Sequence, residues 1–110
     1  MTRAVRHCTA NAKALDPWAI DAMLLDVPGW AVIDSALSRE FTLPDYRATI
    51  AFVNAVASIA EQEDHHPDMT VGYTTCRVSW STHSAGGALS DNDFICAAKV
   101  NALYHHQEDA

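Results

Sequence analysis

Three histidines in the second half of this 110-residue chain follow predicted secondary-structure elements. His65 and His66 come directly after a long helical pattern, and His83 comes just after the last predicted strand. Loops that leave a rigid scaffold are a common place for catalytic residues. If the two strands between these positions pair as a hairpin, His83 lies close to His65 and His66. The sequence therefore predicts that three imidazoles gather at one end of the fold.

Three interpretations fit such a cluster: two kinds of chemistry, and histidines without a function. Imidazoles can give and take protons near neutral pH, which suits general acid–base catalysis, and three of them can hold Zn²⁺ with a position left for water. Adjacent residues of an extended chain point to opposite faces, so His65 and His66 would not easily bind one ion. In the third interpretation, His65 and His66 are a surface pair and His83 is an incidental histidine, and none of them has a chemical role. Carboxylates at the same ends of the elements could orient the imidazoles: Glu61, Asp64, Asp68 and Asp93.

Composition excludes several other classes of function. The chain is 49% apolar and 19% charged, as globular proteins are. Its seven Lys and Arg against fourteen Asp and Glu give a net charge of −7, which disfavours a non-specific nucleic-acid binder. The longest apolar run is residues 94–98, too short to cross a bilayer, and no secretory signal is expected. Three cysteines without metal-site spacing indicate reduced thiols in a cytoplasmic protein.

The pattern of apolar residues predicts a single domain over residues 1–110, with residues 1–15 as a loose N-terminal extension. The order is α-β-β-α-β-β-α, with helices over 17–27, 45–63 and 90–103 and strands over 30–33, 36–42, 69–74 and 77–81. Asp34 and Ser35 form the first hairpin turn. Two hairpins separated by a helix favour an α+β fold, a four-stranded antiparallel sheet with helices packed on one face.

Smaller signals add detail to this arrangement. Ser90 and Asp93 resemble a capping box that starts the last helix. All three tryptophans are expected in the core or on the sheet face, although Trp80 could instead help to floor a pocket: Trp18, Trp30 and Trp80. The remaining histidines are expected at exposed termini: His7, His105 and His106.

Taken together, the spaced residues resemble the signature of a known family. Glu61, His65-His66-Pro67, Tyr73, His83 and Asp93 are separated by three, five, nine and nine residues. Similar flanks occur at Trp30, Arg39-Glu40-Phe41, Ala60, Thr82 and Leu89. This pattern resembles that of the pterin-4a-carbinolamine dehydratases and covers roughly residues 16–103.

The resemblance implies a fold, an activity and a site. The fold is the same α+β arrangement. The activity is dehydration of 4a-hydroxytetrahydropterin to quinonoid dihydropterin, which recycles the tetrahydropterin used by aromatic amino acid hydroxylases, with no metal and no organic cofactor. By position, three histidines would line the pterin site: His65, His66 and His83.

Individual roles follow from that chemistry as expectations. His65 and His83 would exchange the protons while His66 positions the pterin. Further substrate contacts are expected from Asp64, Pro67, Thr82 and Ser84. Glu61 would orient an imidazole, as Asp64 also could, and Asp93 would cap the last helix beside the site.

The same family includes binding proteins, which leaves an alternative function. Some members act as dimerisation cofactors for a homeodomain transcription factor, and some bacterial relatives assist rubisco assembly. Such relatives tend to lack part of the histidine set, which is complete here. The resemblance also implies a homodimer or homotetramer and a functional link to an aromatic amino acid hydroxylase, without direct nucleic-acid or membrane binding.

Overall fold

A four-stranded antiparallel sheet forms one layer of the molecule. The computed structural model describes residues 3–108, with side chains as far as residue 105. The strands lie in the order β1-β2-β4-β3 and span Ala31–Ile33 (β1), Ala36–Thr42 (β2), Asp68–Val71 (β3) and Thr75–Trp80 (β4). Asp34 and Ser35 form the predicted first turn with φ values of 50° and 67°, a geometry that suits the twist of a two-residue hairpin.

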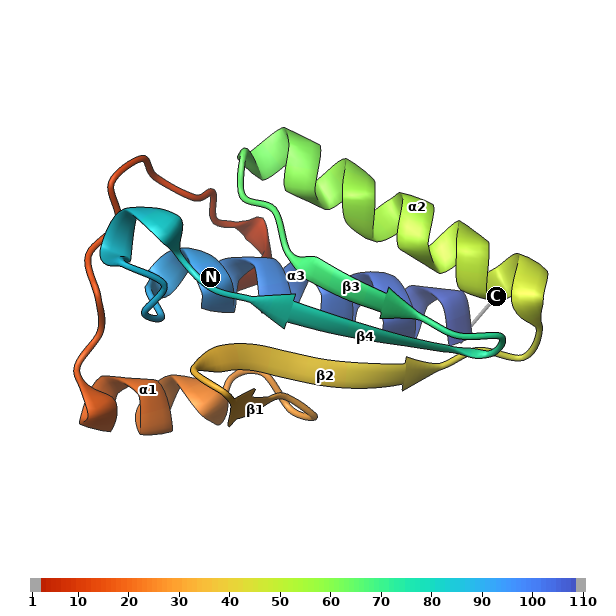
Figure 1. The fold of residues 1–110 in the computed structure, drawn as a ribbon, viewed down its shortest axis with the longest axis horizontal. Helices are drawn as coiled ribbons and strands as arrows, with labels where there is room; N and C mark the ends of the chain where they lie inside the picture. The colour runs from red at the N-terminus through yellow and green to blue at the C-terminus, as the bar shows by residue number, and fades with distance from the viewer. Residues whose placement is uncertain (1–2, 109–110) are drawn as a thin grey trace.

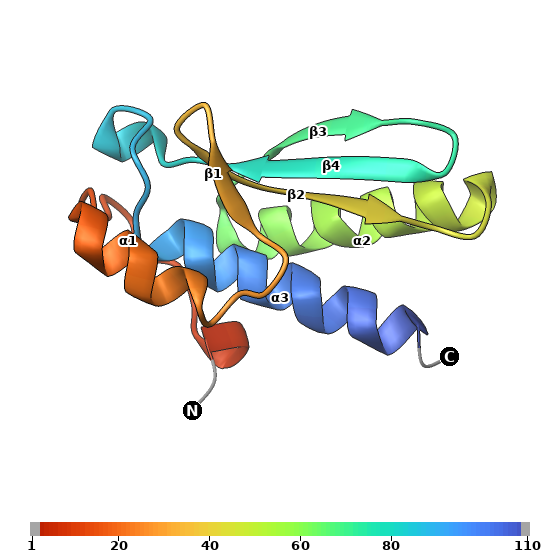
Figure 2. The same cartoon turned by 90° about the horizontal axis from the view of Figure 1, so that it is seen from below.

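Three helices and two short 3₁₀ turns complete the fold. The helices are Pro17–Leu24 (α1), Tyr46–Glu63 (α2) and Asp91–Glu108 (α3), and the 3₁₀ turns are Arg3–Val5 (η1) and His83–Ala85 (η2). The long helices α2 and α3 lie on the same side of the sheet and leave its other side uncovered (Figures 1 and 2). The predicted α+β class, element order and single helical layer are confirmed. None of the described helices is long and apolar enough to cross a membrane.

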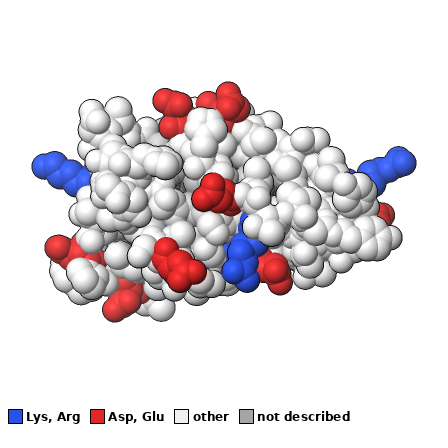
Figure 3. All heavy atoms as spheres, in the orientation of Figure 1, with Lys and Arg blue, Asp and Glu red and all other residues white. Residues whose placement is uncertain are grey.

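The core lies between the sheet and these two helices. Register pairs Leu37 with Trp80 and Phe41 with Cys76, and all four of these side chains are buried. The Phe41 ring lies 4.8 Å from that of Phe52 on α2, and all these contacts bury apolar surface. Full burial stabilises each large side chain by about 1.5–3 kcal/mol, so this layer holds the strand ends in place. Acidic side chains are scattered over the face in Figure 3 and form no single patch.

Helix ends are set by local capping. Asp45 accepts a hydrogen bond from the Ala48 N–H (2.8 Å) and starts α2. Before α3, the Asp93 carboxylate accepts from the Ser90 N–H (2.8 Å), which confirms the predicted capping box. Helix α2 ends where Asp64 adopts the left-handed conformation (φ 50°, ψ 46°), which turns the chain out of the helix just before His65.

Three predicted details were wrong, the first two because a local turn replaced a regular element. Helix α1 ends at Leu24, since i→i−3 hydrogen bonds tighten the chain through to Val27. Strand β3 ends at Val71, because the hairpin closes between Gly72 and Thr75; Tyr73 is therefore an exposed turn residue. Helix α3 continues past the predicted end to Glu108.

The tryptophans and terminal histidines divide between buried and exposed positions. Trp30 and Trp80 are buried as predicted, but the prediction for Trp18 was wrong, because the side chain is 73% exposed on α1. His7 and His105 are exposed, and the His106 side chain lies outside the described residues.

Candidate active site

A cavity of about 370 Å³ lies where β3 begins and β4 ends. It is lined from four separate parts of the chain: Thr9, Ala10, Asn11, Asp64, His65, His66, Thr82, His83, Ser84 and Asn92. The pairing of Asp68 with Ser79 brings the residues just before β3 next to those just after β4. All three candidate histidines therefore line one cavity, whose volume falls in the range of about 300–1,000 Å³ found for small-molecule sites.

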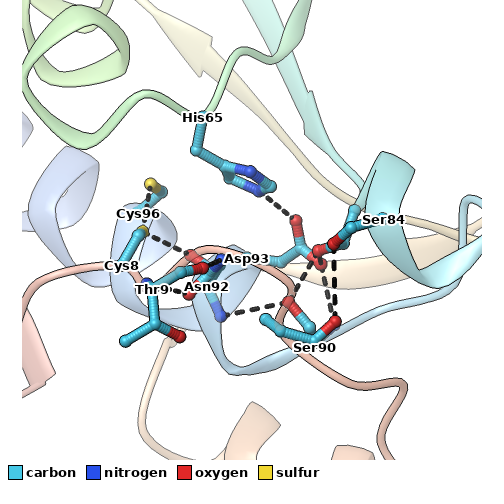
Figure 4. Close-up of polar contacts among 10 residues, drawn as sticks. Cys8, Thr9, His65, Ser84, Ser90, Asn92, Asp93 and Cys96 are labelled. Atoms are coloured by element: carbon cyan, nitrogen blue, oxygen red, sulfur yellow. Dashed lines mark hydrogen bonds and ion pairs between the residues drawn. The ribbon is translucent and has the colours of Figure 1, made fainter.

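His65 is held in one orientation from two sides. Its side chain is 10% exposed, and its Nε2 lies 2.6 Å from Oδ1 of Asp93 (Figure 4). The imidazole also stacks on the indole of Trp80, with ring centroids 5.5 Å apart. Trp80 thus supports a wall of the site, the alternative role that the sequence left open for it. Among the described residues, Nδ1 of His65 has no hydrogen-bond partner and is the nitrogen available to a ligand.

Asp93 is fully buried and receives hydrogen bonds from several directions. Its Oδ2 accepts from the Thr82 hydroxyl (2.7 Å) and from the Ser90 N–H (2.8 Å), while Oδ1 faces Nε2 of His65. A buried carboxylate satisfied in this way is a fixed acceptor. It favours the His65 tautomer that carries its proton on Nε2, with the Nδ1 lone pair directed elsewhere.

The other two imidazoles are less constrained. His66 places Nε2 3.0 Å from Oε1 of Glu61, and its side chain is 56% exposed. His83 lies in η2, exposed, and its imidazole has no hydrogen-bond or ion-pair partner within the described part of the chain. An imidazole without such a partner can turn toward a bound molecule.

The remaining predicted residues fall into two groups. Asp64, Thr82 and Ser84 line the cavity with the histidines, whereas Pro67 follows His66 in the chain and is not a lining residue. The Thr82 hydroxyl is already used by Asp93 and by Ser90 (2.6 Å), so it positions the carboxylate.

Glu61, which is exposed, and Asp93, which is buried, are not lining residues, and each lies within hydrogen-bond distance of one histidine. Within the described residues no group of three or more His, Cys, Asp or Glu side chains could hold a metal ion. His65 and His66 instead pair with different carboxylates.

Sequence reasoning missed the contribution of the N-terminal segment. Residues 3–15, called here the N-terminal strap, lie along α3, and Thr9, Ala10 and Asn11 form part of the cavity wall. No periodicity or motif in these residues indicates a site. Asn92 was also missed, although its position beside Asp93 at the start of α3 was an available signal.

Glu63 anchors the strap at the end of α2. Its side chain is 3% exposed and accepts from the Cys8 N–H (2.7 Å) at one oxygen, while the other oxygen lies 2.9 Å from Nδ1 of His7. Burial alone would raise the pKa of this carboxyl, but the hydrogen bonds from Cys8 and His7 and the Lys99 charge together hold it below its ordinary value. The strap is therefore tied down by a carboxylate that stays charged.

Two thiols meet where the strap crosses α3. Sγ of Cys8 lies 3.6 Å from Sγ of Cys96 and 3.6 Å from the Asn92 carbonyl oxygen (Figure 4). The hydrogen bond with Cys8, followed by burial, raises the pKa of the Cys96 thiol. Both cysteines are free thiols in this structure.

Comparison with known proteins relates most of the chain to one family. The sequence model described as pterin 4 alpha carbinolamine dehydratase matches residues 13–103. A protein of Nitrosospira multiformis, named as a candidate pterin-4-alpha-carbinolamine dehydratase, is 44% identical over 94% of this chain and 90% of its own length. A protein of Xanthomonas oryzae with the same name is 56% identical over 74% of this chain and 70% of its own length.

Two solved structures share the architecture. A transcriptional coactivator/pterin dehydratase from Brucella melitensis superposes with a TM-score of 0.78 at 29% identity, over 83% of this chain and 98% of that one. A pterin dehydratase-like protein described as a RuBisCO assembly factor in the alpha-carboxysome superposes with a TM-score of 0.57 at 25% identity, over 68% of this chain and 86% of that one.

Proposed function

This chain belongs to the pterin-4a-carbinolamine dehydratase family, and we propose that it removes water from a 4a-hydroxytetrahydropterin to give a quinonoid dihydropterin. The observation that carries the proposal is the His65–Asp93 pair at the wall of a cavity that His66 and His83 also line. Such a site offers one fixed imidazole and two less constrained ones to the same small molecule.

The proposed chemistry uses one proton acceptor and one donor. His65 takes a proton from a ring nitrogen at its free Nδ1, and Asp93 stabilises the imidazolium that forms. His83 gives a proton to the hydroxyl on C4a, which departs as water when its C–O bond breaks. The electron pair from the N–H bond forms the new C=N bond. His65 takes up one proton and His83 gives one up, so proton exchange with solvent returns both histidines to their starting states.

His66 has a positioning role in this scheme. Its exposed imidazole is tied to Glu61 on the last turn of α2, and Asp64 and Ser84 lie on the same lining. These groups would hold the polar edges of the pterin while His65 and His83 act on it. An aromatic amino acid hydroxylase in the same compartment, predicted to be the cytoplasm, would supply the substrate.

The test is direct addition of 4a-hydroxytetrahydropterin, with the quinonoid product followed in a spectrophotometer. We expect the wild-type protein to accelerate dehydration over the buffer rate, and His83→Ala to remove most of the acceleration. Lys13→Gln, an exposed change outside the cavity lining, is the matched control and should behave as wild type. A wild-type rate equal to that of buffer would contradict the proposal.

A second function, as a non-catalytic assembly or dimerisation cofactor, is supported by the likeness to the RuBisCO assembly factor and to the coactivator. Absence of acceleration, together with capture of a partner complex, would favour it. Homodimer or homotetramer formation remains a prediction in either case. The edge strands β1 and β3 expose Val32, Ile33 and Val71, which is a physical reason to pair with a second copy.

A further inference from the structure

The N-terminal strap supplies three of the ten residues that line the cavity: Thr9, Ala10 and Asn11. These positions lie before residue 13, where the match to the family begins. They are small or uncharged, whereas the rest of the lining includes the three histidines. This part of the wall therefore lies outside the segment matched to the family, and it carries none of the proposed catalytic histidines.

The strap is held at the cavity by side chains on both long helices. Asn92 of α3 makes a paired contact with the Thr9 backbone: its Oδ1 accepts from the Thr9 N–H (3.0 Å), and its Nδ2 donates to the Thr9 carbonyl oxygen (2.8 Å; Figure 4). Glu63 of α2 fixes the adjacent Cys8 N–H at 2.7 Å. A segment anchored this way presents a formed wall and pays little ordering entropy when a ligand binds.

Further contacts fix the two ends of the strap. The Arg3 guanidinium lies 2.7 Å from Oδ1 of Asp91, and the Lys99 ammonium donates to the Ala4 carbonyl oxygen at 2.7 Å. Beyond the cavity, the Leu15 N–H donates to the Leu89 carbonyl oxygen at 2.9 Å. Residues 9–11 are therefore held between fixed points on either side.

The middle of the strap keeps its own side chains free for a ligand. Thr9, Ala10 and Asn11 are all exposed. Within the described residues the Thr9 hydroxyl and the Asn11 carboxamide have no hydrogen-bond partner, since the contacts of Thr9 use its backbone alone. Asn11 has a φ of 57°, a left-handed conformation that asparagine and glycine tolerate best.

We propose that the N-terminal strap is a substrate-binding element, through which Thr9, Ala10 and Asn11 contact the bound pterin and determine its affinity and not its rate of dehydration. The proposal rests on the proposed function for the nature of the ligand. None of the three residues can exchange protons near neutral pH, so their substitution should change KM and leave kcat nearly as it was.

Two substitutions test the strap without disturbing the fold. Ala10→Leu adds volume at an exposed position of the lining, and we expect it to raise KM roughly 10-fold or more. Asn11→Gly removes the carboxamide while keeping the left-handed backbone, and we expect KM to rise about 2- to 10-fold, as for loss of one hydrogen bond. Lys13→Gln, in the same segment but outside the lining, is the control and should keep the wild-type KM.

Binding of 7,8-dihydrobiopterin, which has no hydroxyl on C4a and so cannot be dehydrated there, separates this proposal from the proposed function. Its dissociation constant, measured by fluorescence titration, should rise in Ala10→Leu and Asn11→Gly as KM does. Wild-type KM and affinity in both variants would overturn the strap proposal while leaving dehydration intact. Weakened binding in these variants of a protein without dehydratase activity would support the strap and contradict the function. A wild-type protein that binds no pterin would overturn both.

Discussion

The imidazole of His65 lies parallel to the indole of Trp80, with an interplanar angle of 6° and ring centroids 5.5 Å apart. Trp80 is fully buried in β4, so its indole covers one face of the imidazole and restricts how far the ring can tilt. Asp93 fixes the ring within its own plane through Nε2. The two contacts leave one edge of the imidazole, that of Nδ1, to meet a ligand. A fixed ring reduces the reorganisation that proton transfer would otherwise require.

Alanine substitution of the three histidines should affect kcat and KM differently. We expect His65→Ala and His83→Ala each to lower kcat about 10²- to 10⁴-fold, the usual loss for one general acid or base. His66→Ala should mainly raise KM, because His66 is assigned to positioning. Initial rates over a range of 4a-hydroxytetrahydropterin concentrations measure both constants. Wild-type kcat in both His65→Ala and His83→Ala would contradict the assignment.

Asp93→Asn should lower both stability and activity. The carboxamide cannot accept from every donor that Asp93 satisfies, and an unsatisfied buried donor costs about 1–3 kcal/mol of unfolding free energy. It also frees the His65 ring, so kcat should fall. Asp91→Asn on the same turn is the control: its ion pairs with Arg3 and Arg6 are partly exposed and contribute about 0–1 kcal/mol. Urea unfolding measures the difference, and equal losses in the two variants would argue against a special role for Asp93.

The anchoring of the strap by Glu63 should depend on pH in one direction. Because the folded protein holds the pKa of Glu63 below its ordinary value of 4.5, this carboxylate stabilises the fold fully above about pH 4.5. The contribution is lost as pH falls through the lowered folded pKa. Wild type should therefore have a higher Tm than Glu63→Gln at about pH 7, and the gap should close as the pH falls below about 4.5. A Tm difference that widened in acid would contradict the lowered pKa of Glu63.

The cysteines should differ in reactivity. Contact with Cys8 and burial raise the pKa of Cys96, and burial raises that of Cys76, so both carry little of the thiolate that alkylating reagents require. Iodoacetamide should therefore modify the half-buried Cys8 first, as followed by peptide mass spectrometry. The protein unfolded in urea is the control, in which all three cysteines should react alike. Preferential labelling of Cys96 in the folded protein would contradict the expectation.

Local signals in the sequence were enough to predict most of the scaffold. The apolar spacing of α2 and the capping box of Ser90 and Asp93 depend on residues within a few positions of each other, and the structure has both. The positions of His65 and His83 followed from a single hairpin, whose pairing brings them to one cavity.

Features that depend on distant contacts could not be predicted in this way. Glu63 contacts His7, which lies 56 positions earlier in the chain, and the strap has no periodic pattern that predicts where it docks. The side-chain direction of Trp18 depends on which face of α1 the rest of the fold covers, which spacing alone does not specify. The resemblance to a family assigned roles to the candidate residues, but it covered roughly residues 16–103 and did not include the strap.

The docking of the strap has a consequence for how the protein matures. The strap is synthesised before its anchors Glu63 and Asn92. It cannot dock until α2 has formed and α3 has begun, and contacts between such distant positions form slowly. During refolding, helical signal should therefore return before the ability to bind a pterin. We therefore expect the part of the cavity wall that the strap supplies to be completed only after α2 and α3, although its residues precede both helices in the chain.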